Sequence, residues 1–376
     1  MAMRRYTVSF AFAGMSRVVI RTLCRSLCLG LPLAASAQAA SVVFLNPGLS
    51  DETFWVGYSR FMQAAADDLG MDLRVEYGER QAERQLEQAR AVLQGEHKPD
   101  YLVLVNEQYV APEIMRLSQG SGVKLLLVNN GLTEGQAEEI QAQPGKYAPL
   151  LGSLVGNDEQ AGYQMLHDLV ASLPRTGEPI ELLAFSGIST TPASQLREQG
   201  MRRALAEFPH VRLRQLVYGG WSRQRAFEQA KLLLQRYPRV RLVWSANDQM
   251  AFGAMQAFES VGLVPGRDVL FSAVNSSPEA LQARVDGRLS VLMGGHFSLG
   301  GWAMVMLHDD ARGLAMDRDG QHLYRLPVLQ AIDAAKAQRW LELSARKGYD
   351  VDFRRYSAEG RGTDYRYPFL TSPVDY

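Results

Sequence analysis

Polar and aromatic side chains follow most of the short apolar runs of this chain, at the points where strands should end. The first run, "SVVFL" at 41–45, is followed at 50–55 by "SDETFW". Because parallel strands gather their carboxyl ends at one edge of a sheet, we expect the residues after each run to share a crevice. These candidates are Glu52, Phe54, Trp55, Asn106, Glu107, Asn129, Asn130, Ser186, Gly187, Arg197, Trp221, Asn247, Asp248, Asn275 and His296.

This set is rich in amides, carboxylates, arginine and tryptophan, and it lacks a nucleophile with an adjacent base. Planar amides and carboxylates form paired hydrogen bonds, arginine offers a rigid fork of donors, and aromatic rings stack on flat apolar faces. Such a combination favours holding a small polyhydroxylated molecule over breaking one. We therefore predict a binding protein and not an enzyme.

Each candidate also has a purely structural explanation. Asn and Asp after strands often form turns or cap helices. Phe54 and Trp55 would point about 100° apart on one helix, so we expect one to pack in the core and at least one to face the crevice. Arg197 could instead pair with Glu198 or Glu207 on a solvated helix face.

Several chemical classes lack their sequence signals. The six histidines are scattered without metal-ligand spacing, so we predict no metal site. No glycine-rich nucleotide loop follows a strand, and we predict no cofactor. The stretch at 294–301, "GGHFSLGG", fails the G-x-S-x-G pattern of hydrolases because His296 occupies the first glycine position.

The first forty residues differ from the rest. They contain five arginines and no acid, then "SLCLGLPLAA" and "ASAQAA". This pattern predicts a secretory signal peptide over 1–40, cleaved after Ala37 or Ala39, with Met15 as an alternative start. A membrane anchor is the other explanation, but it needs about 20 apolar residues. Both cysteines, Cys24 and Cys28, lie in this segment, so we expect no disulfide in the mature protein.

The composition favours a globular protein with about two domains. The 376 residues have a formal net charge of zero, with 47% hydrophobic and 21% charged residues. Without the N-terminal arginines the mature chain is mildly acidic and has no basic block, which argues against a nucleic-acid partner. No second long apolar segment follows residue 40, so we expect a soluble protein in an export compartment.

Unbroken apolar runs alternate with helical patterns along the chain. Unbroken runs are typical of strands buried on both faces of a parallel sheet. The β-α alternation predicts a doubly wound α/β fold, and a fresh β-α series at 153–162 indicates two lobes. The predicted strands lie at 41–45, 101–105, 124–128, 180–185, 212–218, 240–245, 268–274 and 289–295.

Several longer motifs then resemble a known family. They are "DETFW", "KPDYLVLVNE", "KLLLVNNG", "FSGISTTPASQLREQGMRRAL", "WSANDQMAFGAMQAFESVG" and "FSAVNSSPEALQARVDGRLSVLM", spread over most of residues 41–300. In these motifs the chain is similar to the type I periplasmic binding proteins of sugar importers, a family that includes ribose-binding protein and the periplasmic autoinducer-2 receptor. The resemblance implies two lobes with three hinge crossings that close on one ligand.

The resemblance also implies roles for individual residues. Phe54 and Trp55 stack on the ligand, Asn129 is a polar contact from the first lobe, and Arg197 clamps ligand oxygens from the second. Asn247 and Asp248 bind hydroxyl groups, and Asn275 stands where sugar binders usually carry Asp.

The chain departs from the family pattern at three points. Glu52 stands where ribose-type binders have Asn, and Asn129-Asn130 replaces Asp-Arg. Gly294 stands where a Gln or Arg is usual, leaving His296 or Trp221 as candidate substitutes. A common pentose or hexose therefore cannot be assumed, and the pattern is closer to the autoinducer receptor.

From the resemblance we expect a monomeric periplasmic protein that delivers a sugar-like ligand to an ABC importer. The alternative is a receptor subunit whose closure is read by a membrane sensor. We expect an N-terminal lobe from 41–153 plus 295–326, and a C-terminal lobe with tail from 154–294 plus 327–376.

Overall fold

The computed structural model describes residues 7, 9, 39–143, 145–173, 178–314, 323–362 and 364–374. The predicted signal peptide therefore lies almost wholly outside the described residues. From Ala39 onward the chain forms one compact unit, which contains the whole fold described below. Every helix in the described part of the chain is too short or too polar to span a bilayer.

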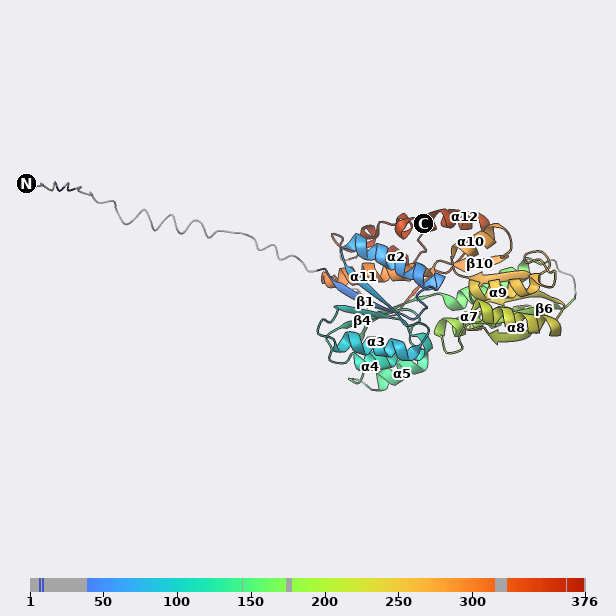
Figure 1. The fold of residues 1–376 in the computed structure, drawn as a ribbon, viewed down its shortest axis with the longest axis horizontal. Helices are drawn as coiled ribbons and strands as arrows, with labels where there is room; N and C mark the ends of the chain where they lie inside the picture. Colours follow the sequence, from blue (N-terminus) through green and yellow to red (C-terminus); the bar gives the residue numbers. More distant parts are fainter. Residues whose placement is uncertain are drawn as a thin grey trace, which may run out of the picture. The chain divides into compact units, whose positions relative to one another are not determined.

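The first lobe is built on a six-stranded parallel sheet, counted over the described residues (Figure 1). Parallel pairing runs through every neighbouring pair of strands. In spatial order the strands are β11 (Leu323–Leu326), β5 (Leu150–Gly156), β4 (Lys124–Asn129), β3 (Tyr101–Leu104), β1 (Ser41–Asn46) and β2 (Asp72–Tyr77).

Helices cover both faces of this sheet. Successive side chains of a strand point to opposite faces, and in β1 Phe44 belongs to one apolar cluster while Leu45 belongs to the other. The Phe44 face carries α2 (Thr53–Leu69) and α11 (Leu299–Ala311), which pack against each other. The Leu45 face carries α3 (Ala82–Gln94), α4 (Ala111–Leu117) and α5 (Glu134–Ala142) (Figure 1).

The second lobe holds another six-stranded sheet in the described chain, in which only the short β12 runs antiparallel. Its strands, in spatial order, are β12 (Gln330–Ala331), β10 (Val291–Gly294), β9 (Leu270–Val274), β8 (Val240–Ser245), β6 (Ile180–Ser186) and β7 (Val211–Tyr218). Its helices are α6 (Asp158–Ala171), α7 (Pro192–Glu207), α8 (Arg223–Arg236), α9 (Asp248–Glu259) and α10 (Pro278–Val285).

The chain passes between the two sheets three times. It leaves the first sheet after β5, returns after β10 through the short helix η2 (His296–Ser298), and crosses again between β11 and β12. The first and third crossings are tied together, because the Asn157 side chain donates to the Leu329 carbonyl at 3.1 Å and accepts from the Leu329 amide at 2.9 Å.

The C-terminal segment contacts both lobes. Helix α12 (Ala334–Ser344) packs on α10 of the second lobe. The short helices η3 (Lys347–Asp350) and η4 (Phe353–Tyr356) then contact α2, and η5 (Pro368–Leu370) contacts β11, all in the first lobe. Grouping 327–376 with the second lobe, as the sequence suggests, therefore describes α12 but not the helices that follow it.

The buried carboxylate of Asp309 on α11 anchors this last segment. It accepts hydrogen bonds from the Ala358 amide at 2.6 Å, the Tyr367 hydroxyl at 2.8 Å and the Ser357 hydroxyl at 2.5 Å. Burial alone would raise the pKa of Asp309, but these bonds and one from His308 outweigh it and lower the pKa.

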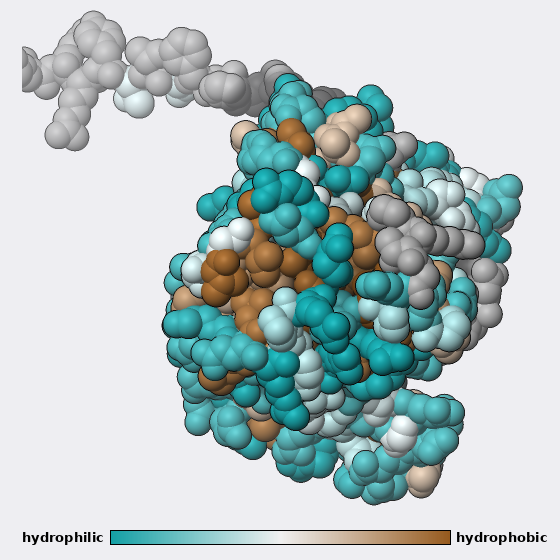
Figure 2. All heavy atoms as spheres, turned by 90° about the vertical axis from the view of Figure 1, so that its right-hand side faces the viewer, coloured by the Kyte–Doolittle hydropathy of each residue, from teal (hydrophilic) through white to brown (hydrophobic). Residues whose placement is uncertain are grey.

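The predicted fold class is confirmed, because both lobes are doubly wound α/β layers around a mainly parallel sheet. The division of the chain into independent units at residues 153, 294 and 326 stays a proposal. The molecular surface on the side of the second lobe is mostly hydrophilic, with one area where apolar residues gather (Figure 2).

Candidate functional site

A pocket with a free volume of about 40 Å³ lies between the carboxyl edges of the two sheets. Both lobes supply its walls, as expected of ligand sites in open α/β sheets. Its lining residues are Glu52, Phe54, Trp55, Arg80, Glu107, Asn129, Asn130, Thr191, Ala193, Arg197, Trp221, Asn247, Asn275 and His296.

Two aromatic residues at the start of α2 form one wall. Trp55 is buried and lies so close over Gly48 that a Cβ at that glycine would be 2.2 Å from the indole Cδ1. Phe54 is half-buried and meets Trp55 edge-on at 4.9 Å between ring centroids. Its ring stacks on His296 at 4.5 Å. Both aromatics line the pocket, and Trp55 belongs to the core as well.

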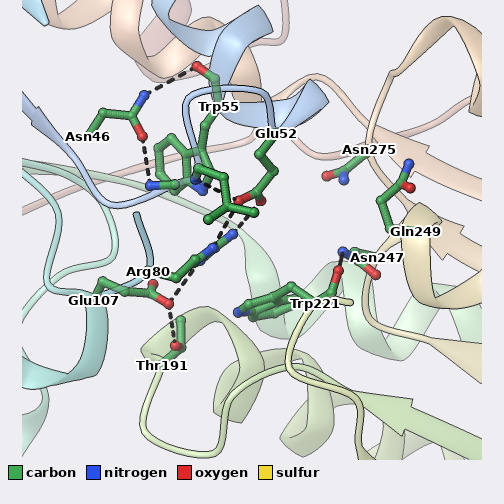
Figure 3. Close-up of polar contacts among 12 residues, drawn as sticks. Asn46, Glu52, Trp55, Arg80, Glu107, Thr191, Trp221, Asn247, Gln249 and Asn275 are labelled. Atoms are coloured by element: carbon green, nitrogen blue, oxygen red, sulfur yellow. Dashed lines mark hydrogen bonds and ion pairs between the residues drawn. The ribbon is translucent and has the colours of Figure 1, made fainter. Parts of the chain in front are cut away.

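A charged triad of Glu52, Arg80 and Glu107 forms the floor on the first-lobe side (Figure 3), with Glu107 buried and the other two residues half-buried. Arg80 donates to both oxygens of Glu52 and, through Nη1, to Oε1 of Glu107 at 3.0 Å. The Glu52 carboxylate also accepts from the Leu49 amide. The backbone of Arg80 has φ of +58°, a left-handed conformation that L-residues rarely adopt. The single guanidinium balances one of the two carboxylate charges inside the wall, so the triad has a net charge of −1 when all three groups are ionised.

Glu107 also connects the two lobes. Its Oε1 accepts from the Thr191 hydroxyl at 2.9 Å, and its Oε2 accepts from the Asn130 amide at 3.2 Å. Asn130 in turn accepts from the Ala193 backbone amide at 3.1 Å. Burial raises the pKa of Glu107 above its usual range, although Arg80 and Thr191 act in the opposite direction.

Arg197 lies buried at the back of the second-lobe side. Its Nε donates to Asp158 at 2.7 Å, and its Nη1 donates to the Ala246 carbonyl at 2.8 Å. Its Nη2 lies 3.4 Å from Nε2 of His296. Glu198 and Glu207 are not its partners, so the surface ion pair considered from the sequence is absent at this residue.

His296 is held neutral. Burial lowers the pKa of His296 well below its usual value, and the charge of Arg197 lowers it further. Since the Arg197 guanidinium can only donate, Nε2 of the imidazole accepts and the ring proton lies on Nδ1. That Nδ1 atom is buried without a partner.

Three loop residues complete the second-lobe wall (Figure 3). Asn247 caps α9, accepting from the Met250 amide at 2.9 Å and donating to the Trp221 carbonyl at 3.2 Å. The Trp221 ring lies on Gly187, where a Cβ would come within 2.1 Å of the indole. Asn275 has φ of +125° and donates to Asp248 at 2.7 Å.

Asp248, also predicted to bind the ligand, does not line the pocket. As the first residue of α9 it is buried, and its carboxylate accepts from Asn275, from the Ser277 hydroxyl at 2.5 Å and from the Gln249 amide. Burial raises the pKa of Asp248, although these hydrogen bonds act to lower it. It therefore positions Asn275 from behind.

The sequence assigns ten residues to ligand binding, and the pocket brings together all of them except Asp248: Glu52, Phe54, Trp55, Asn129, Arg197, Trp221, Asn247, Asn275 and His296. Glu107 and Asn130 were among the strand-end candidates but outside that set, and Arg80, Thr191 and Ala193 were not predicted at all. Gly294 has no side chain to contribute to the pocket, and a Cβ atom at this position would lie only 2.4 Å from Ser276 Oγ. No side chain can therefore reach the pocket from this position without a shift of the chain.

No group of three or more His, Cys, Asp and Glu side chains gathers as a metal site in the described part of the chain.

The sequence model of the protein family described as "Periplasmic binding protein domain" matches residues 42–314 of this chain, which include every lining residue of the pocket. The chain belongs to the periplasmic binding protein family.

Solved and curated members of the family are similar over most of this chain. A crystal structure of a periplasmic sugar-binding protein from Pseudomonas fluorescens is 59% identical, with a TM-score of 0.81 over 88% of this chain and 98% of that one. The ribose import binding protein RbsB of Escherichia coli is 22% identical over 72% of this chain and 84% of its own length. A galactofuranose-binding protein structure, 18% identical with a TM-score of 0.70, shares the fold over 82% of this chain and all of that one.

Proposed function

We propose that this periplasmic binding protein captures a sugar-like small molecule between its lobes and presents it to an ABC importer. The observation that carries the proposal is the pocket itself, because residues from both lobes enclose it with aromatic faces and amides. A ligand that touches both lobes binds the closed arrangement better and so shifts the lobe equilibrium toward closure. We propose that the residues of the pocket wall, with Asp248 behind them, form the ligand site.

The family supports this function. RbsB of Escherichia coli is by name a ribose import binding protein, and a relative from Actinobacillus succinogenes is a D-apiose import binding protein. We propose the periplasm as the location, with residues 1–40 as the export signal, and a monomer that meets a membrane permease only when closed. The pocket contains no side chain set for covalent chemistry, which supports binding without catalysis.

A thermal-shift screen of the mature protein, residues 40–376, tests the proposal. The panel contains ribose, allose, apiose, arabinose and galactofuranose at millimolar concentration. A ligand present at a hundred times its Kd stabilises the folded state by about 2.7 kcal/mol, and at least one sugar should raise the melting temperature by several degrees. No shift with any of them would refute sugar capture. Loss of the shift in Trp55→Ala would place it in this pocket.

A further inference from the structure

Three polar atoms at the pocket residues are buried without a hydrogen-bond partner. They are the indole Nε1 atoms of Trp55 and Trp221 and the imidazole Nδ1 of His296. An indole N–H can only donate, and the tautomer of His296 makes its Nδ1 a donor too. A buried donor without a partner costs about 1–3 kcal/mol, so these groups favour a ligand that brings acceptor oxygens.

The two indoles come from opposite lobes. Trp55 lies at the start of α2, and Trp221 lies in the turn before α8, with its ring nitrogen turned toward Arg80 and Glu107 (Figure 3). Gly48 and Gly187 let the two tryptophan side chains approach the backbone closely. A molecule that accepts from both indoles therefore touches both lobes at once.

The carboxylates of the pocket are already engaged. Glu52 accepts from Arg80 and Leu49, and Glu107 accepts from Arg80, Asn130 and Thr191. A sugar hydroxyl that accepts from an indole must also place its own proton, and each of these carboxylates already accepts three hydrogen bonds on its roughly four lone-pair sites. A ring ether or carbonyl oxygen accepts without donating, so it fits this position better than a free hydroxyl.

The charges argue against an ionic ligand. Arg80 and Arg197 each bind a carboxylate, and three carboxylates (Glu52, Glu107 and Asp158) surround these two cations. A carboxylate on the ligand would be buried beside them without a free cation. An ammonium group would add donors to a site whose unpartnered groups are themselves donors.

We propose, resting on the proposed function, that Trp55 and Trp221 select the ligand through their N–H groups. The ligand is an uncharged sugar or sugar lactone that places a ring or carbonyl oxygen at each indole. Stacking alone would accept any ligand with a flat apolar face. Two N–H donors from opposite lobes instead distinguish ligands by the positions of their acceptor oxygens.

The first test compares three probes with one carbon skeleton, namely D-ribose, D-ribono-1,4-lactone and D-ribonate, and repeats this for the allose and arabinose series. Isothermal titration of the wild-type protein should give binding of a neutral form and at least hundredfold weaker binding of the matching aldonate. An aldonate that binds as tightly as its neutral forms would overturn the proposal. Absence of any binding, by these probes and by the remaining sugars of the thermal-shift panel, would refute the proposed function, and this inference with it.

The second test removes the N–H and keeps an aromatic ring. Trp55→Phe and Trp221→Phe should each weaken binding of the best probe about tenfold, the value of one hydrogen bond of about 1.4 kcal/mol. Replacing Trp221 by 3-benzothienylalanine, which keeps the two-ring shape without the N–H, should cause the same loss. If this isosteric replacement binds like the wild type, stacking is sufficient and the proposal is wrong, while the proposed function stands.

Tyr58→Phe is the matched control. The Tyr58 hydroxyl is also buried and without a partner, and its ring packs beside Trp55, but it does not line the pocket. Its removal should leave the affinity unchanged. The melting temperature of each variant without ligand shows whether the variant is folded, and so distinguishes loss of binding from loss of folding. Because Trp221 is only half-buried, its variants should fold even if Trp55→Phe does not.

Discussion

Replacement of Arg80 by methionine should destabilise the protein in a pH-dependent way. The variant keeps the length of the side chain and removes the charge between Glu52 and Glu107. The side chain of Glu107 is 2% exposed and that of Arg80 is 18% exposed, so solvent replaces little of the lost interaction. Losing an adjacent cation raises a carboxyl pKa by about one to three units. At about 1.4 kcal/mol per unit, Arg80→Met should cost about 1.4–4 kcal/mol near pH 7.5.

The sign of the pH dependence follows from the direction of the pKa of Glu107. Burial already raises this pKa in the folded protein, and removal of Arg80 raises it further above the value in the unfolded chain. The folded variant therefore binds more protons than the unfolded chain between the two pKa values, and its stability falls as pH rises through that window. The destabilisation should be smaller at pH 5 than at pH 7.5 by about 1 kcal/mol or more.

Urea unfolding of the mature protein, followed by tryptophan fluorescence at both pH values, measures this difference. Addition of Glu107→Gln to the variant should recover much of the lost stability at pH 7.5, because the uncompensated buried charge is then gone. Arg60→Met, at an exposed arginine of α2, is the control and should change stability by less than about 0.5 kcal/mol. Equal destabilisation at both pH values, without recovery in the double variant, would show that Arg80 does not compensate a buried Glu107 charge.

Two further predictions concern packing and the C-terminal anchor. Gly187→Ala should weaken sugar binding at least tenfold, because its Cβ would lie 2.1 Å from the Trp221 ring; Gly57→Ala, where nothing lies within 4 Å, should bind normally in the same titration. Asp309→Asn should lower the melting temperature most at pH 7, and the effect should shrink as pH falls below about 4. The lowered pKa of Asp309 stabilises the fold above its unfolded value, and this contribution is lost as pH falls through the folded value. If the difference in melting temperature between wild type and Asp309→Asn does not change with pH, the ionised carboxylate of Asp309 does not anchor the C-terminal segment.

The predicted ranges include most of the strands that are buried on both faces, but they omit the edge strand β2 and also β5, β11 and β12. Apolar runs such as "YLVLV" are recognisable because neither face meets water. In β2, "DLRVEY" carries charged residues and is only partly buried. Arg80 follows this strand, so the strand-end rule that found Glu52 and Asn129 passed over it.

Other site features depend on geometry that residue types do not encode. Asn247 and Asp248 are neighbours of similar chemistry, yet Asn247 lines the pocket while Asp248, the first residue of α9, turns toward Asn275 and Ser277. Thr191 and Ala193 contribute through contacts across the lobes, between positions 63 or more residues apart in sequence. Such pairings are set by tertiary packing and have no local signal.

The anchored C-terminal segment determines when the first lobe can finish folding. The ring of Phe353 packs on Phe61, and Phe369 stacks on Trp302 at 4.8 Å. The Phe353 amide bonds Asp68 across 285 residues of sequence. The second lobe has almost all of its strands in one continuous stretch, whereas the first lobe needs the last residues of the chain to close its core. As the chain emerges from a ribosome or a translocation channel, the first lobe therefore begins to form first but completes its core last.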